Sequence, residues 1–162
     1  GDVPDYPAIY ERLTGMEYLN FIGDVYGVMK KDRLERIEKW LEIFELAQAV
    51  SSPIQSYSHG MKQKIVLLAA LLPAPQVMVL DEPLGGLDPR ASHSLKELMR
   101  EQCDRGRTLF FSTHIMEVAE RLCDHVAVIR EGRLIATGSV DQVRGAEADL
   151  ESAFLRLVGV PL

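Results

Sequence analysis

Two adjacent acids, Asp81 and Glu82, directly follow the apolar segment Val77–Leu80. An apolar run before two acids is typical of a strand that delivers carboxylates to the carboxyl edge of a parallel sheet, where the ligands of such sheets bind. Carboxylates at that edge can hold Mg²⁺ (Asp81) and polarise an attacking water (Glu82), which is the chemistry of nucleotide hydrolysis. The alternative is a buried strand that ends in a solvated acidic turn.

A candidate anion site lies earlier in the chain, at residues 58–61 (SHGM). Ser58 and Gly60 stand beside the free backbone N–H groups of a predicted helix start. Those groups and the helix macrodipole favour negative charge, so this end can bind a phosphate. The alternative is that Ser58 is an ordinary N-cap without a ligand.

A glycine turn follows the two acids, at residues 84–89 (LGGLDP). Gly85 and Gly86 permit unusual backbone angles. Pro89 is favoured at the first position of a helix, which places Asp88 just before it. On these residues alone, the segment is a turn that leads into a capped helix.

His114 follows a second apolar segment, 108–112. If both segments are neighbouring parallel strands, His114 lies at the same sheet edge as Asp81 and Glu82 and can contact a terminal phosphate. The alternative is a structural histidine, which is the only interpretation given to His93 and His125.

Helices are predicted before the first strand, and strands alternate with helices after it. Thr14 and Glu17 form a capping-box pattern that begins a helix to about Tyr26. Apolar residues at helical spacing predict a second helix over 31–47: Leu34, Ile37, Trp40, Leu41 and Phe44. A third helix starts at Ser58, and its apolar segment 65–72 indicates deep burial.

The alternation of elements predicts an α/β fold with a parallel sheet whose strands are buried on both faces. The expected strands are 77–80, 108–112, 125–130 and 133–137, the last two joined at Glu131-Gly132, and the expected helices are 90–104, 115–123, 139–144 and 150–158. This divides the chain into a helical part at 1–72, a sheet-containing part at 73–146 and a terminal helix at 147–162.

The composition excludes several classes of protein. The chain has 162 residues, 47% hydrophobic and 26% charged, and a formal net charge of −6, which gives no reason to expect nucleic acid as a partner. Its two cysteines, Cys103 and Cys123, have no metal-ligand spacing. The longest apolar run, 65–72, is much shorter than the roughly 20 residues that a membrane-spanning helix needs.

The order of the motifs resembles that of the ATP-binding-cassette (ABC) ATPases over essentially the whole chain. Ser58-His59-Gly60-Met61 is similar to the signature motif, Val77–Glu82 to the Walker B strand, Gly85–Asp88 to the D-loop and His114 to the switch histidine. Residues 131–139 (EGRLIATGS) are similar to the hairpin after the switch. The resemblance implies a P-loop NTPase (RecA-like) sheet core preceded by an ABC-type helical subdomain.

The resemblance also implies the roles of the site residues, with ATP and Mg²⁺ as cofactors. Asp81 would hold Mg²⁺ through water, Glu82 would be the catalytic base, and His114 would contact the γ-phosphate. Ser58 and Gly60 would face the nucleotide of a second ATPase domain in a head-to-tail dimer, with Asp88 at the dimer contact. Membrane permease subunits would be the other partners, so the protein would lie on the cytoplasmic face of the membrane and power transport.

Three departures from the family pattern modify these expectations. His59 and Met61 replace a glycine and the glutamine of the usual signature, a variant similar to those of exporter-type ATPases. Asp5 stands where the family has the glutamine of its Gln loop. No glycine is followed by lysine, so the P-loop motif G-x-x-x-x-G-K-[ST] is absent.

The absent P-loop leads to the expectation that the chain is the C-terminal two-thirds of an ABC ATPase, inactive alone. In the family, the P-loop strand lies between the strands that correspond to 108–112 and 125–130, so the sheet core is expected to be incomplete, with a gap there. One alternative is a non-catalytic remnant that docks to a permease or a second cassette. Another is an ABC-type ATPase of DNA repair or translation, which the lack of long heptads and of basic linkers disfavours.

Overall fold

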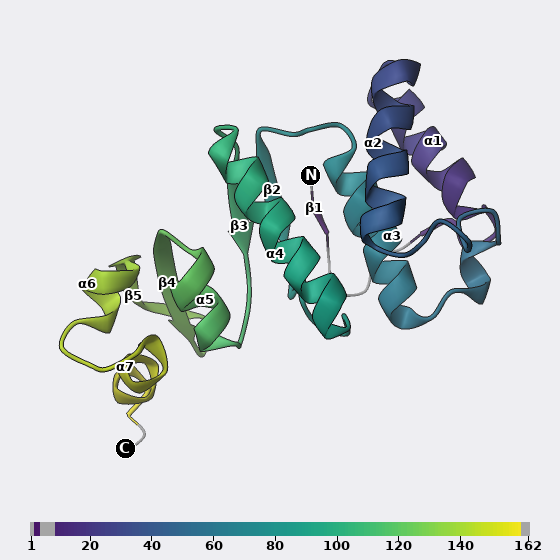
Figure 1. Ribbon diagram of the computed structural model, residues 1–162. Coiled ribbons are helices and arrows are strands. Elements are labelled where there is room, and N and C mark those ends of the chain that lie inside the picture. Colours follow the sequence, from purple (N-terminus) through teal and green to yellow (C-terminus); the bar gives the residue numbers. More distant parts are fainter. Residues whose placement is uncertain (1, 4–8, 160–162) are drawn as a thin grey trace. The chain divides into compact units, whose positions relative to one another are not determined.

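The computed structural model describes residues 2–3 and 9–159, which form two compact units (Figure 1). The first unit ends at Ser112 and the second begins at Thr113. The three-part division expected from the sequence stays a prediction. In the described part of the chain, no helix is long and apolar enough to cross a membrane.

Three α-helices and a short 3₁₀ helix precede the main strands of the first unit: α1 (Gly15–Val25), α2 (Lys30–Ile43), the 3₁₀ turn (Ile54–Ser56) and α3 (His59–Leu71). Helix α1 begins at the predicted capping box: the Thr14 hydroxyl accepts from the Glu17 N–H, and the Glu17 carboxylate accepts from the Thr14 N–H. Ser58 caps α3, as predicted. Both helix starts were therefore predicted correctly from the sequence.

Helix α2 ends at Ile43, four residues before the predicted end at 47. Glu45 has a positive φ of 56°, and the Leu46 N–H donates to the Leu41 carbonyl at 2.8 Å. This is a Schellman motif, which usually places glycine at the left-handed position. The glutamate in that position explains why the sequence did not reveal the end of the helix.

In the helical part of the unit, most of the apolar residues at helical spacing in and just after α2 are buried. Ile37, Trp40, Leu41 and Phe44 are 0–6% exposed, whereas Leu34, near the start of α2, is 39% exposed. In α3 and its C-cap, Ile65 to Leu72 are buried apart from the half-buried Ala70, as the apolar segment predicted.

A buried arginine, which the sequence did not single out, joins α1 to α2. The Arg33 guanidinium donates to Asp24 Oδ1 at 2.5 Å, to the Asn20 carbonyl at 3.0 Å and to the Val28 carbonyl at 3.1 Å. A Cβ on Gly23 would overlap Arg33 Nε, so the arginine occupies the space that this glycine leaves.

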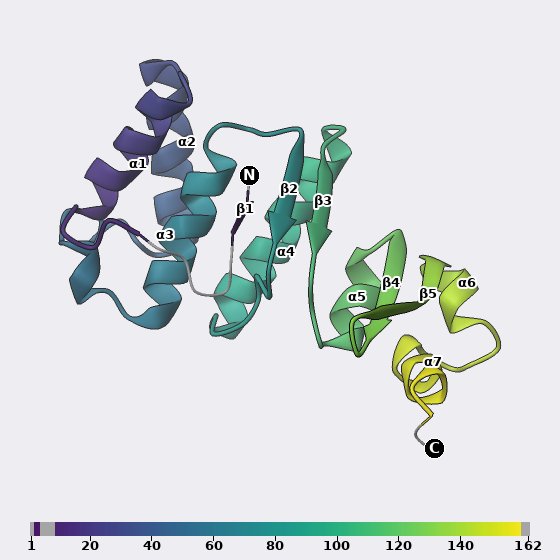
Figure 2. The ribbon, with the colours of Figure 1, turned by 180° about the vertical axis from the view of Figure 1, so that it is seen from behind.

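The sheet of the first unit contains three parallel strands in the order β1 (Asp2–Val3), β2 (Val77–Leu80), β3 (Thr108–Phe111). Helix α4 (Pro89–Asp104) covers one face of β2 and β3, which Figure 2 shows from behind. Met78 and Leu80 are 1% exposed.

The prediction that both strands are buried on two faces is wrong. Val77, Val79 and Phe110 are 44–61% exposed, and the register pairs Val79 with Phe110, so these two share a face. Alternate residues of a strand point to opposite faces. The face opposite Met78 and Leu80 is therefore open at these positions.

The second unit contains an antiparallel hairpin, β4 (His125–Arg130) and β5 (Arg133–Ser139), with α5 (Met116–Leu122), α6 (Val140–Arg144) and α7 (Leu150–Leu157). Glu131 and Gly132 both have positive φ (51° and 74°), as a type I′ turn requires, so the predicted hairpin is confirmed. The core of this unit includes Ala119, Val128, Val143 and Leu150.

The two sheets are not joined to each other. Among the strands of the described residues, β3 pairs only with β2 and β4 only with β5. Within the described residues, β3 and β4 therefore each have one unpaired edge. The gap expected between the segments at 108–112 and 125–130 stays a prediction.

Candidate functional site

The acids Asp81 and Glu82 lie at the carboxyl end of β2, beside the end of β3, as predicted. The Ser112 hydroxyl donates to Asp81 Oδ1 and accepts from the Glu82 N–H at 3.0 Å. Asp81 is exposed and Glu82 is half-buried. One serine therefore bridges the two acids and fixes the start of the turn that follows β2.

Ser112 was not identified as a site residue from the sequence. The signal available was its position: it is the first residue after β3, and its N–H continues the ladder to the Leu80 carbonyl at 3.0 Å. In a parallel register that position lies next to Asp81, but only the pairing of the strands shows it.

Glu82 has a backbone conformation that is unusual for its type. Its φ is 44°, in the left-handed region, which costs a non-glycine residue about 1–2 kcal/mol. Its N–H is held by Ser112, and its carbonyl accepts from the Gly85 N–H at 2.9 Å. Strain of this kind persists where surrounding contacts over-determine it, and it is concentrated at functional sites.

The signature segment is a capped helix start that packs against the glycine turn. Ser58 Oγ accepts from the Met61 N–H at 3.3 Å, so the hydroxyl serves as the cap. A Cβ on Gly60 would lie 3.0 Å from the Gly86 carbonyl oxygen. Gly60 is thus required for close packing inside the chain, independently of any ligand.

Asp88 caps α4 and pairs with a residue of α3. Its Oδ1 accepts from the Ala91 N–H at 2.8 Å, and Oδ2 lies 3.1 Å from Lys64 Nζ. The Ala91 N–H, and after it the hydrogen bond from Lys64, lower the pKa of the Asp88 carboxyl below its usual value. Lys64 was not predicted, because nothing in its sequence surroundings indicates a partner 24 residues away.

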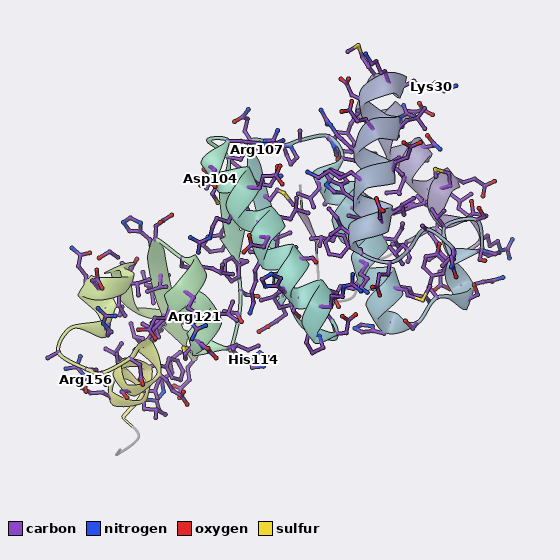
Figure 3. All side chains as sticks on the ribbon, in the orientation of Figure 1. Lys30, Asp104, Arg107, His114, Arg121 and Arg156 are labelled. Atoms are coloured by element: carbon purple, nitrogen blue, oxygen red, sulfur yellow. The ribbon has the colours of Figure 1, made fainter. Side chains whose placement is uncertain are left out.

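His114 belongs to the second unit, in the segment between β3 and α5 (Figure 3), and is exposed. Its proximity to Asp81 and Glu82 stays a prediction. Asp5, at the Gln-loop position, lies outside the described residues.

The donor chemistry near Asp81 suits Mg²⁺ in a nucleotide complex. In the described part of the chain, no three His, Cys, Asp or Glu side chains cluster as a metal site. Mg²⁺ is usually bound in such sites by one or two carboxylates, water and the phosphates of the substrate. The Asp81 carboxylate and the Ser112 hydroxyl, both oxygen donors, fit that pattern.

Comparisons with known proteins found a family model, a solved structure and curated relatives that match this chain. A family model described as "AAA domain, putative AbiEii toxin, Type IV TA system" matches residues 25–120. A solved ATP-binding subunit of an ABC transporter is 36% identical, with a TM-score of 0.92 over 97% of this chain and 67% of that one.

Curated relatives point the same way. The ABC-type transporter ATP-binding protein EcsA of Bacillus subtilis is 34% identical over 96% of this chain and 64% of its own length. The Nod factor export ATP-binding protein I of Cupriavidus metallidurans is 33% identical over 91% and 48%. The chain spans about half the length of the curated relatives that it matches. It has the α/β fold of the P-loop NTPases and belongs to the ATP-binding subunits of ABC transporters.

Proposed function

We propose that the complete protein hydrolyses ATP and that this chain supplies the catalytic base. The observation that carries the proposal is the Ser112 bridge between Asp81 and Glu82 at the carboxyl edge of the sheet. Asp81 would hold Mg²⁺ through water, and the ion would neutralise charge on the phosphates. Glu82 would orient and deprotonate the attacking water, and His114 would contact the γ-phosphate.

A second ATPase domain completes the proposed site. Ser58 and Gly60 would face the nucleotide bound by that domain, in a head-to-tail dimer, and Asp88 would lie at the dimer contact. The support is the N-terminus of the 13-residue helix α3, whose first N–H groups favour an anion. The family membership supports the dimer.

Export is the proposed direction of transport. The support is the name of one relative, the Nod factor export ATP-binding protein I. Permease subunits would carry the substrate, and the helical part of this chain, about residues 10–72, would transmit motion to them. The protein would then lie on the cytoplasmic face of the membrane.

The experiment is Glu82→Gln in the complete protein. The amide keeps the shape of the side chain but cannot accept the proton, so ATP binding should persist and hydrolysis should nearly stop. Glu97→Gln, on the exposed face of α4, is the matched control for the change in charge. Near wild-type hydrolysis by Glu82→Gln would refute the assignment of the base.

A docking module without hydrolysis is the second candidate function. The absence of any Gly-Lys pair in these 162 residues favours it, because the P-loop lysine stabilises the β- and γ-phosphates. We expect no ATP hydrolysis by the chain alone. Mg²⁺-dependent phosphate release that Glu82→Gln abolishes would contradict this expectation.

A further inference from the structure

Helix α3 contacts the start, the middle and the end of the turn 82–88. At the start, Gln63 Nε2 donates to the carbonyls of Glu82 and Pro83, at 3.3 and 3.4 Å. In the middle, Gly60 packs against Gly86. The end is held by the Lys64–Asp88 ion pair described above.

Gln63 is the most buried side chain of this set, at 5% exposed. Its two carbonyl neighbours fix the orientation of the carboxamide, because only the NH₂ end can donate to them. The other end, Oε1, is buried and has no hydrogen-bond partner in the described part of the chain. A buried unpaired acceptor is unfavourable, and an apolar side chain of similar size would avoid that cost. The donor group aimed at Glu82 is what distinguishes glutamine from such a side chain.

The hydrogen bond from Gln63 reaches Glu82, the residue with the strained backbone. The Glu82 carbonyl accepts from Gly85 and from Gln63, and the Glu82 N–H donates to Ser112. Hydrogen bonds therefore hold Glu82 on both sides of its α-carbon, where φ is 44°. The backbone angles of a residue determine which rotamers its side chain can adopt, so these bonds restrict the direction of the Glu82 carboxylate.

We infer that Gln63 is a positioning residue for Glu82: it acts through the Glu82 carbonyl to hold the carboxylate in its hydrolytic orientation. The inference rests on the proposed function of Glu82. Gln63 itself touches no substrate in this role. Gln63 also links helix α3, which begins at Ser58, directly to Glu82, the proposed base of the same chain. This link does not involve Gly85 or Gly86.

The test uses the complete protein and two variants, Gln63→Leu and Gln63→Glu. Leucine removes the donor and the unpaired acceptor together, whereas glutamate keeps the shape and replaces the NH₂ donor by a second carboxyl oxygen. We expect both to lower kcat about 5- to 10-fold, the value of a net hydrogen bond, with KM for ATP within about twofold of wild type. Lys62→Met is the matched control on the same helix, since Lys62 pairs with Glu11, and should keep kcat.

A double-mutant cycle with Glu82→Gln separates positioning from stability. In the Glu82→Gln background, measured by single-turnover hydrolysis, Gln63→Leu should cause no further loss. Equal losses in both backgrounds, or unchanged kcat in both Gln63 variants, would overturn the inference. Full activity in Glu82→Gln would instead overturn the proposed function, so the two failures are distinguishable.

Discussion

The helices α1–α3 and the strands β2 and β3 belong to one unit, but they use their apolar residues differently. Ile37 and Leu68 in the helices are 0% exposed, whereas Phe110 in β3 is 61% exposed. The helical spacing of the apolar residues predicted which side of α2 is buried, because such spacing marks the one face of a helix that packs against its neighbours. A continuous apolar strand indicates cover on two faces, and α4 supplies cover on only one.

The largest expected effect contrasts a core leucine with the open face. Leu68→Ala in the 162-residue chain should lower the free energy of unfolding by about 2–5 kcal/mol, because it leaves a cavity. Phe110→Ala should cost less than about 1 kcal/mol, since the ring is already largely in solvent. Denaturant unfolding measures both. Equal losses of unfolding free energy in the two variants would show that Phe110 is covered in solution. That result would contradict the difference between the helices and the strands.

A smaller effect is expected from Arg33, which belongs to the closed helical part. Arg33→Met should cost about 2 kcal/mol, because the carbonyls of Asn20 and Val28 lose a charged donor. Lys31→Met, exposed on the same helix, is the control.

Gly23→Ala sharpens the test of this contact. It should destabilise the wild type, since the new Cβ would overlap the Arg33 side chain, and it should be tolerated better in the Arg33→Met background, where the guanidinium is gone. Denaturant unfolding of the two single variants and the double variant measures the difference. Additive losses in the double variant would contradict the assigned contact.

The open edge and open face of the sheet predict association. Unpaired strand edges recruit other chains, and Phe110 adds an apolar side chain next to that edge. Light scattering after size exclusion should show self-association of the chain, and Phe110→Lys should weaken it. Amide hydrogens of 108–111 and 125–130 should exchange faster than those of α3. A monomer with both segments strongly protected would refute this prediction.

The smallest effect concerns pH. The pKa of Asp88 is lowered by the Ala91 N–H and by Lys64, so its folded value lies below its unfolded value. Its contribution to stability is therefore present above about pH 4 and is lost as the pH falls through the folded pKa. Asp88→Asn should make the free energy of unfolding fall less steeply as the pH is lowered into the acid range. An unchanged acid limb would contradict the contacts assigned to Asp88.

Local signals in the sequence predicted local features well. The caps at Thr14 and Ser58, the hairpin turn at Glu131-Gly132 and the acids after β2 each depend on neighbouring residues. Ser112, Gln63 and Lys64 depend on contacts between distant segments, so no pattern near them indicates their partners. The end of α2 was missed for a different reason, because a glutamate occupies the position that usually signals a stop.

The pairing of the strands also has a consequence for the order of events as the chain folds. The hairpin joins Arg130 to Arg133, and such hairpins form in about 1–10 μs. In contrast, β1 pairs with Val79 and Leu80, near the middle of the chain, and β2 pairs with β3 across the whole of α4. Closing such long loops is entropically costly and slow. During synthesis β1 must therefore wait for β2, and Asp81 and Glu82 are joined by Ser112 only after α4 has emerged.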